Sequence, residues 1–173
     1  MNIFVLDSDI TEATRAHCDT HCSKMILECA QMLSNASLVA SGKLKLFTKP
    51  NGKGGCSIKD TIPSIYKADI RHVYHPCTKW VYSSRDCFEW LVEFAVKLNE
   101  EKIYRTSRSH ASVDVVKACR KYCRLLPHHG LLPFAQAMPD TYRSSNAIKA
   151  YRRFYIEDKA HLLQYTRRFL LVG

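Results

Sequence analysis

Hydrophobic residues recur at intervals of three and four over most of the chain, which is the spacing of one face of an α-helix. Between about residues 20 and 40, Met25, Cys29 and Met32 share such a face. The pattern therefore predicts a helix over this range. Gly42 is expected to end it, because glycine is favoured just after a helix.

A second apolar stripe, from Trp80 to Leu98, predicts the longest core helix, over about residues 79–104. Serine and aspartate side chains that can cap helices precede further helical patterns. These predict helices over about residues 10–17, from Ser109 or Ser112 through Cys123, and from Ser144 or Ser145 through about Arg167.

Two segments do not follow the helical pattern. Asn2–Leu6 is a short apolar run, predicted to be a strand or an extended buried segment. Residues 42–63 contain four glycines, two prolines and five lysines, which predicts a flexible loop or a mobile hairpin. An idle surface insertion is favoured there over a basic loop at a substrate entrance. The fold class predicted is a mainly α, single-domain helical bundle over residues 1–173.

The positive charge is concentrated in the second part of the chain. Residues 102–173 hold 14 lysines and arginines against four acids, whereas residues 1–101 hold 12 of each, so this part accounts for the formal net charge of +10. It also contains nine aromatic residues, from Tyr104 to Phe169. Cations neutralise phosphates and flat rings stack on bases, so this composition favours DNA or a phosphorylated nucleotide as partner over a merely solvated basic face.

Bulk features exclude several classes of protein. No apolar run approaches the roughly 20 residues that span a bilayer, and the acidic Asp7 follows the first apolar run, which is unlike a signal peptide. No membrane association is predicted. The eight cysteines lie largely among apolar residues at helical spacing, so they are predicted to be mostly free thiols in a reducing, intracellular compartment.

The first candidate site lies in the predicted helix over residues 20–40. His21, Lys24 and Glu28 are spaced three and four apart, so they share one helix face. A glutamate near a histidine and a lysine can move protons if it is partly buried, although a plain surface ion pair explains Lys24 and Glu28 equally well. Histidine and cysteine pairs in the same region also have spacings seen in zinc sites, but a structural role is favoured, and neither a metal nor a cofactor is predicted.

Further candidates are His75, which precedes a proline at a helix entrance, and Asp140, a rare acid in a basic region. Asp140 is expected to orient an arginine or a catalytic histidine, or to cap a turn. Tyr151 and Tyr155 repeat at helical spacing beside Arg152, which suits either a grip on a base or the inner face of a packed helix. The complete set predicted to bind nucleic acid is Lys24, Lys117, Arg120, Lys121, Arg124, Arg143, Tyr151, Arg152, Tyr155 and Lys159.

Signature motifs of dinucleotide-binding folds, P-loops, hydrolase elbows and zinc deaminases are absent from the sequence. Other motifs extend over most of the chain outside residues 42–63, and they resemble a poorly characterised family of small proteins from phages and large DNA viruses. They are Met1-Asn-Ile-Phe-Val-Leu-Asp7, His21-x-x-Lys24-Met25-x-x-Glu28, His75-Pro76-Cys77-x-x-Trp80, Pro133-Phe134-x-x-Ala137-Met138-Pro139-Asp140-x-Tyr142 and Ala150-Tyr151-Arg152-x-x-Tyr155-x-x-x-Lys159.

The first third is also similar, more faintly, to the all-helical pyrimidine-dimer DNA glycosylase/AP lyases of phages. Those enzymes use an N-terminal α-amine as nucleophile and a helix glutamate seven residues after a histidine, the spacing of His21 and Glu28. The resemblance implies that the α-amine of Met1 attacks C1′ of a damaged or modified pyrimidine nucleotide while Glu28 stabilises charge or moves protons. In those enzymes a small polar residue, not methionine, leads the chain.

Three functions are therefore open at the level of the sequence. The first is a viral DNA glycosylase/lyase with Met1, His21, Glu28, His75 and Asp140 as catalytic candidates. The second is a non-enzymatic nucleic-acid-binding or host-takeover protein, in which these residues are structural. The third is an enzyme or sponge that binds a small phosphorylated nucleotide. The oligomeric state is not predicted.

Overall fold

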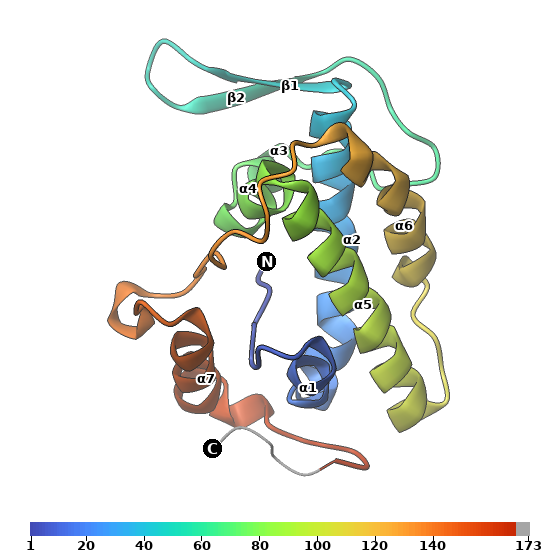
Figure 1. Ribbon diagram of the computed structural model, residues 1–173, viewed down its shortest axis with the longest axis vertical. Helices are drawn as coiled ribbons and strands as arrows, with labels where there is room; N and C mark the ends of the chain where they lie inside the picture. The colour runs from blue at the N-terminus through green and yellow to red at the C-terminus, as the bar shows by residue number, and fades with distance from the viewer. Residues whose placement is uncertain (169–173) are drawn as a thin grey trace.

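The computed structural model describes residues 1–168, and it confirms a mainly α fold (Figure 1). Phe169, one of the aromatic residues of the basic part, lies outside the described residues. The helices of the described part are α1 Ile10–Arg15, α2 Asp19–Ala40, α3 Ile70–Val73, α4 Pro76–Ser83, α5 Arg85–Thr106, α6 Ser112–Cys119 and α7 Ala147–Asp158. Short 3₁₀ helices follow as η1 Arg120–Leu125, η2 Asp140–Tyr142 and η3 Ala160–Leu162.

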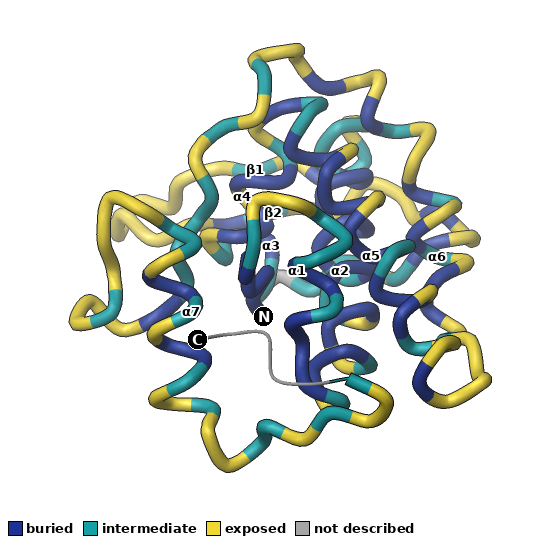
Figure 2. Tube along the Cα trace, turned by 60° about the horizontal axis from the view of Figure 1, so that its bottom comes forward, coloured by how far each residue is buried: buried dark blue, intermediate teal, exposed yellow. Residues whose placement is uncertain are grey.

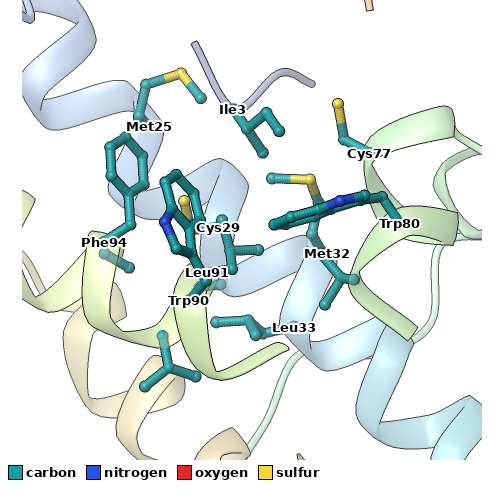
Figure 3. Packing of buried hydrophobic residues seen from close by; sticks show 14 of the residues in the cluster. Ile3, Met25, Cys29, Met32, Leu33, Cys77, Trp80, Trp90, Leu91 and Phe94 are labelled. Atoms are coloured by element: carbon teal, nitrogen blue, oxygen red, sulfur yellow. The ribbon is translucent and has the colours of Figure 1, made fainter. Parts of the chain in front are cut away.

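Helix α2 is the centre of the bundle and packs against α5, α4 and α6 (Figure 1). The predicted apolar face of α2 is buried, and Met25, Cys29 and Met32 have no exposed surface. Figure 3 shows Met25 and Cys29 beside Phe94 and Trp90 of α5, and Met32 beside Trp80 of α4. The helical period therefore predicted both this element and the direction in which it packs.

The N-terminal segment is extended and buried, and it forms no strand within the described structure. It runs between α7 and the helices α1 and α2, and Figure 2 draws it mostly in the dark blue of buried residues. The Asn2 side chain donates a hydrogen bond to the Ala137 carbonyl at 2.8 Å. At the other end of the segment, Arg152 Nε donates to the Leu6 carbonyl at 2.6 Å. These bonds replace the ladder partners that a strand would have.

The helix predicted over residues 79–104 is in fact two helices, α4 and α5. Ser84 separates them in an extended conformation, with φ −153° and ψ 147°. Its hydroxyl accepts the Asp86 N–H at 3.3 Å and donates to the Gly130 carbonyl at 2.9 Å. A serine that caps a helix while bonding a distant loop breaks the helix without interrupting its apolar pattern.

The last two predicted helices are shorter than expected. Helix α6 gives way to the 3₁₀ helix η1 at Arg120, and α7 ends at Asp158 rather than near Arg167. Asn146 is the N-cap of α7, because its side chain accepts the Lys149 N–H at 3.0 Å.

The glycine-rich segment forms an antiparallel hairpin of β1 Leu44–Thr48 and β2 Gly54–Ile58. It projects beyond the end of α2 (Figure 1). The Tyr74 hydroxyl links the hairpin to the body, because it lies within hydrogen-bond distance of two hairpin carbonyls. It donates to the Phe47 carbonyl at 3.0 Å and to the Gly55 carbonyl at 2.6 Å. Of the two alternatives predicted for this segment, the hairpin is the one observed.

A buried arginine ties the lower end of the bundle together. Arg105 of α5, whose side chain is 1% exposed, donates through Nε to Glu101 at 2.8 Å. Its two terminal nitrogens donate to the carbonyls of His17 at 2.8 Å and Arg15 at 3.0 Å, and to the Asp19 carboxylate at 3.0 Å. One guanidinium thus joins α5, the end of α1 and the start of α2.

The substitution Arg105→Leu is expected to lower the free energy of unfolding by about 3 kcal/mol or more, because it leaves buried acceptors without their donor. Urea unfolding followed by circular dichroism measures this. Arg108→Ala, on an exposed arginine, is the matched control and should change the value by less than about 0.5 kcal/mol. Equal stability of the two variants would contradict the role given to Arg105.

Candidate functional site

A cavity of about 200 Å³ lies between α2, the N-terminal segment and the end of α7. Its polar lining is His21, Lys24 and Glu28 from α2, Lys159 just after α7, and the first two residues of the chain. The histidine, lysine and glutamate share the helix face that their spacing predicted. The chain start completes the site because the buried N-terminal segment runs beside that face.

Glu28 is the acidic centre of the cavity. Its Oε2 accepts the Asn2 backbone N–H at 2.8 Å and lies 3.9 Å from the Met1 α-amine. Its Oε1 lies 3.7 Å from Lys24 Nζ. The Glu28 side chain is 13% exposed, so the carboxylate faces two amines in a largely desolvated place. Electrostatic attraction is stronger there than at the surface.

His21 is held between an aromatic ring and a tyrosine. Its ring stacks on Phe4, with centroids 4.9 Å apart and planes at 23°. Its Nδ1 lies 2.8 Å from the Tyr155 hydroxyl, which is also 3.2 Å from Cys18 Sγ. The Tyr155 hydroxyl donates its hydrogen to Cys18 Sγ, so its oxygen accepts the hydrogen of His21 Nδ1 and Nε2 is left as an acceptor.

The pKa of His21 is lowered to about 4, first by burial and then by the positive charges of Lys24, Lys159 and His161. The imidazole is therefore neutral at pH 7. In that state it acts as a hydrogen-bond acceptor through Nε2 rather than as a cation.

His75 lies on the side of the α-amine but does not line the cavity. It is the N-cap of α4, where its Nδ1 accepts the Cys77 N–H at 3.2 Å. The pKa of His75 is lowered to about 4. Burial is the largest cause, and the positive charge of the α-amine and the neighbouring His72 act in the same direction. This histidine is therefore neutral as well, and its bond to α4 fixes the ring next to the chain start.

Asp140 does not join the cluster. Its side chain is 89% exposed and pairs with Arg143, the residue after η2, at 2.7 Å, and neither residue lines the cavity. The expectation that Asp140 orients a catalytic histidine is wrong in this structure. Asp140 pairs with an arginine, which agrees with the alternative that it orients one.

The two tyrosines predicted to grip a base are buried. Tyr151 and Tyr155 have no exposed surface. The Tyr151 hydroxyl donates to the Ala135 carbonyl at 2.6 Å, while that of Tyr155 is used by His21 and Cys18. Stacking on a base requires an open ring face, so the prediction that they bind nucleic acid is wrong, and the alternative of a packed inner face is observed. Arg152, between them, forms an ion pair with Asp7 at 2.6 Å.

The predicted basic residues do not form one continuous surface. Lys24 and Lys159 line the cavity beside α2, whereas Lys117, Arg120, Lys121 and Arg124 line a second hollow of about 480 Å³ on α6 and η1. Figures 1 and 2 place α6 and α7 on opposite sides of α2. A single polyanion platform over the second part of the chain is therefore not what the structure shows.

Several residues that shape the cavity were not predicted from the sequence to have a role. Phe4, Met25, Phe154 and Leu162 form its apolar wall, and Asn2 supplies the backbone donor to Glu28. The signal for Phe4 and Asn2 was their place in the apolar N-terminal run. Their approach to Glu28 depends on contacts between segments far apart in the chain, which periodicity does not reveal.

No protein-family model matches this chain, and neither the curated proteins nor the solved structures yielded a similar protein. The resemblance to viral proteins and to pyrimidine-dimer glycosylases therefore stays a prediction. Among residues 1–168, no helix combines the length and apolarity that a bilayer crossing requires. All eight cysteines are free.

We expect acid to destabilise the protein through its buried histidines. Burial lowers the pKa of His17 to about 3 and that of His21 to about 4, both from 6.5. The unfolded chain therefore binds protons first, and the free energy of unfolding should fall as the pH drops from about 6.5 to 4. His21→Gln should remove part of this fall, on the order of 2 kcal/mol after allowance for solvent access.

Urea unfolding at pH 7, 5.5 and 4.5 measures the dependence. His129→Gln, on an exposed histidine, should keep the slope of the unsubstituted protein. If His21→Gln and the unsubstituted protein lose stability in parallel, His21 is not the group that resists protonation.

Proposed function

We propose that this protein is a DNA-acting enzyme, a base glycosylase with lyase activity on damaged or modified pyrimidines. The observation that carries the proposal is the position of Glu28, whose carboxylate faces the Met1 α-amine at 3.9 Å and Lys24 Nζ at 3.7 Å inside one cavity. An amine paired with a carboxylate is the minimal set for attack on a sugar carbon followed by proton transfer.

The chemistry assigns one role to each group. The neutral amine forms a bond to C1′ of the target nucleotide as the bond from C1′ to the base breaks, and the first proton that the amine loses passes through Glu28 to the departing base. The C1′–O4′ bond then breaks, O4′ takes the second amine proton by the same route, and the opened sugar is held as an imine. Glu28 takes the proton that the amine loses and stabilises the positive charge that develops on the sugar.

The rest of the lining fits this scheme. Lys159 and whichever amine is not the nucleophile provide positive charge for the phosphates that flank the nucleotide. Neutral His21 accepts through Nε2. The cavity, at about 200 Å³, is smaller than the roughly 300 Å³ at which pockets for drug-sized ligands begin. It therefore suits one sugar or one base, which an enzyme of this class turns out of the duplex.

The wider setting is part of the same proposal. Free cysteines are typical of a reducing, intracellular compartment, and all eight are free here. Together with the resemblance of the motifs, this favours action on DNA inside an infected cell.

The arrangement of charge also favours a second candidate, a protein that binds a small phosphorylated nucleotide. The cavity lining holds the α-amine, Lys24, Lys159 and one carboxylate, that of Glu28; Asp158, which pairs with Lys159 at 2.6 Å, lies outside the lining, and the basic residues of α6 lie elsewhere. A mononucleotide would then raise the melting temperature, whereas an oligonucleotide duplex of the same concentration would not.

Borohydride trapping tests the enzyme directly. The protein is incubated with a labelled duplex containing an abasic site or a damaged pyrimidine, and sodium borohydride reduces any imine to a stable adduct. We expect a covalent adduct whose formation is slowed at least 100-fold by Glu28→Gln. Peptide mapping of the adduct then assigns the amine to Met1 or Lys24, and the same mass spectra establish the residue that starts the purified chain.

Glu93→Gln is the matched control, since Glu93 is an exposed helix carboxylate outside the cavity. It should trap at the rate of the unsubstituted protein. Two results would contradict a glycosylase/lyase. One is that neither the abasic nor the damaged duplex forms an adduct, and the other is that Glu28→Gln and Glu93→Gln form the adduct at the same rate.

A further inference from the structure

The hairpin β1–β2 has two faces of opposite character. Its register pairs Leu46 with Cys56 and Phe47 with Gly55. Backbone bonds extend the pairing beyond both strands, from Lys59 N to the Lys43 carbonyl at 2.7 Å and from Lys49 N to the Lys53 carbonyl at 2.8 Å. Side chains alternate along a strand, and paired residues share a face, so the odd-numbered residues of both strands lie together.

The odd face collects every lysine of the hairpin. Its members are Lys43, Lys45, Phe47, Lys49, Lys53, Gly55, Ser57 and Lys59. The even face contains Leu44, Leu46, Cys56 and Ile58 instead, and it meets the body at Leu44 and Gly54. Leu44 on that face is buried, and a Cβ added to Gly54 would lie 2.7 Å from the Tyr74 ring.

Phe47 is the centre of the odd face. Its side chain covers Gly55, because a Cβ added there would lie 2.5 Å from the phenyl ring. Phe47 nevertheless remains 47% exposed, although it is a large hydrophobic residue. The ring is therefore supported from below by backbone and open on its other side, as a stacking platform must be.

The lysines around the ring are largely free of acidic partners. Asp60 is the single acid between residues 42 and 63, and it forms an ion pair with Lys43. Across the described residues, Lys45, Lys49, Lys53 and Lys59 form no ion pair. Four uncompensated cations thus flank one open aromatic ring on a ribbon that projects from the body (Figure 1).

We propose that the β1–β2 hairpin is a nucleic-acid-binding arm, in which Phe47 stacks on an unpaired base and Lys45, Lys49 and Lys53 contact the adjoining phosphates. Residues two apart on a strand are separated by about 6.8 Å, so cations and ring form a row along the arm. Rows of cations with an interleaved ring bind single strands through charge and stacking. A membrane surface fits less well, since Phe47 is the one large apolar side chain on this face.

The arm is independent of the chemistry proposed at Glu28. Tyr74 holds the hairpin at its base, and no residue of the hairpin lines the cavity at Glu28. Binding on the arm therefore needs neither the amine nor the carboxylate.

The test is fluorescence anisotropy of the full chain with a labelled, undamaged 20-nucleotide single strand at several salt concentrations. The triple variant Lys45→Ala, Lys49→Ala, Lys53→Ala should bind more weakly, and the slope of log K against log salt should fall by about two. Phe47→Ala should weaken binding at least 5-fold with the slope unchanged. Phe47→Leu, which keeps an apolar side chain without a ring, should be weakened in the same way.

Matched controls locate the effect. Lys117→Ala with Lys121→Ala removes exposed cations from α6 and η1 and should change the affinity by less than 2-fold. Melting temperatures confirm that each variant is folded. Normal binding by the triple variant, loss of binding in the α6 variant instead, or equal binding of Phe47→Leu and the unsubstituted chain would overturn the proposal. So would a stronger effect of the triple variant on binding to phosphatidylserine vesicles than on binding to the oligonucleotide.

Discussion

The structure depends on the burial of the first six residues. Phe4 is the key contact, because the centroid of its ring lies within 6.4 Å of the centroids of five other rings. These belong to His17, His21, Tyr151, Phe154 and Tyr155. The Phe4 backbone has φ +33°, a sparsely populated region that costs on the order of 1–3 kcal/mol for a non-glycine residue. The aromatic contacts offset that cost. Without this segment, α7 would lose the main surface that joins it to α2.

The same contact creates the site. A chain start that passes between α2 and α7 brings a backbone N–H and an α-amine to Glu28, and it closes the cavity with the Phe4 ring. Glu28 is thereby engaged twice. It accepts a structural hydrogen bond through the oxygen nearest the α-amine, and it faces Lys24 with the other. A carboxylate held on one side by backbone is fixed in place, which favours chemistry at its remaining lone pairs.

The spacing of residues along the chain predicted correctly those features that depend on one helix alone. The apolar period of α2 placed its buried face correctly, and the spacing of His21, Lys24 and Glu28 placed them together. The break at Ser84 was missed because it depends on a bond to Gly130, 46 residues away. A helical wheel also does not say which ring face is open, so Tyr151 and Tyr155 were compatible with either base stacking or core packing until their neighbours were known. Similarly, charge counted along the chain does not fix charge in space, and the basic residues separate onto opposite sides of α2.

The hairpin shows how composition can conceal a pattern. Four glycines and five lysines among residues 42–63 indicate a loop when they are counted, yet the lysines all occupy odd positions. Odd positions become one face only when the strands pair in a register whose partners have the same parity, as Leu46 with Cys56 and Phe47 with Gly55 do. A shift of one residue in the pairing would divide the lysines between two faces. The packing of Tyr74 against Gly54 opposes a shift that would bring Lys53 to that position, because the lysine side chain would collide with the ring. The register of the strands, and not the number of lysines, therefore places the charge on one face of the arm.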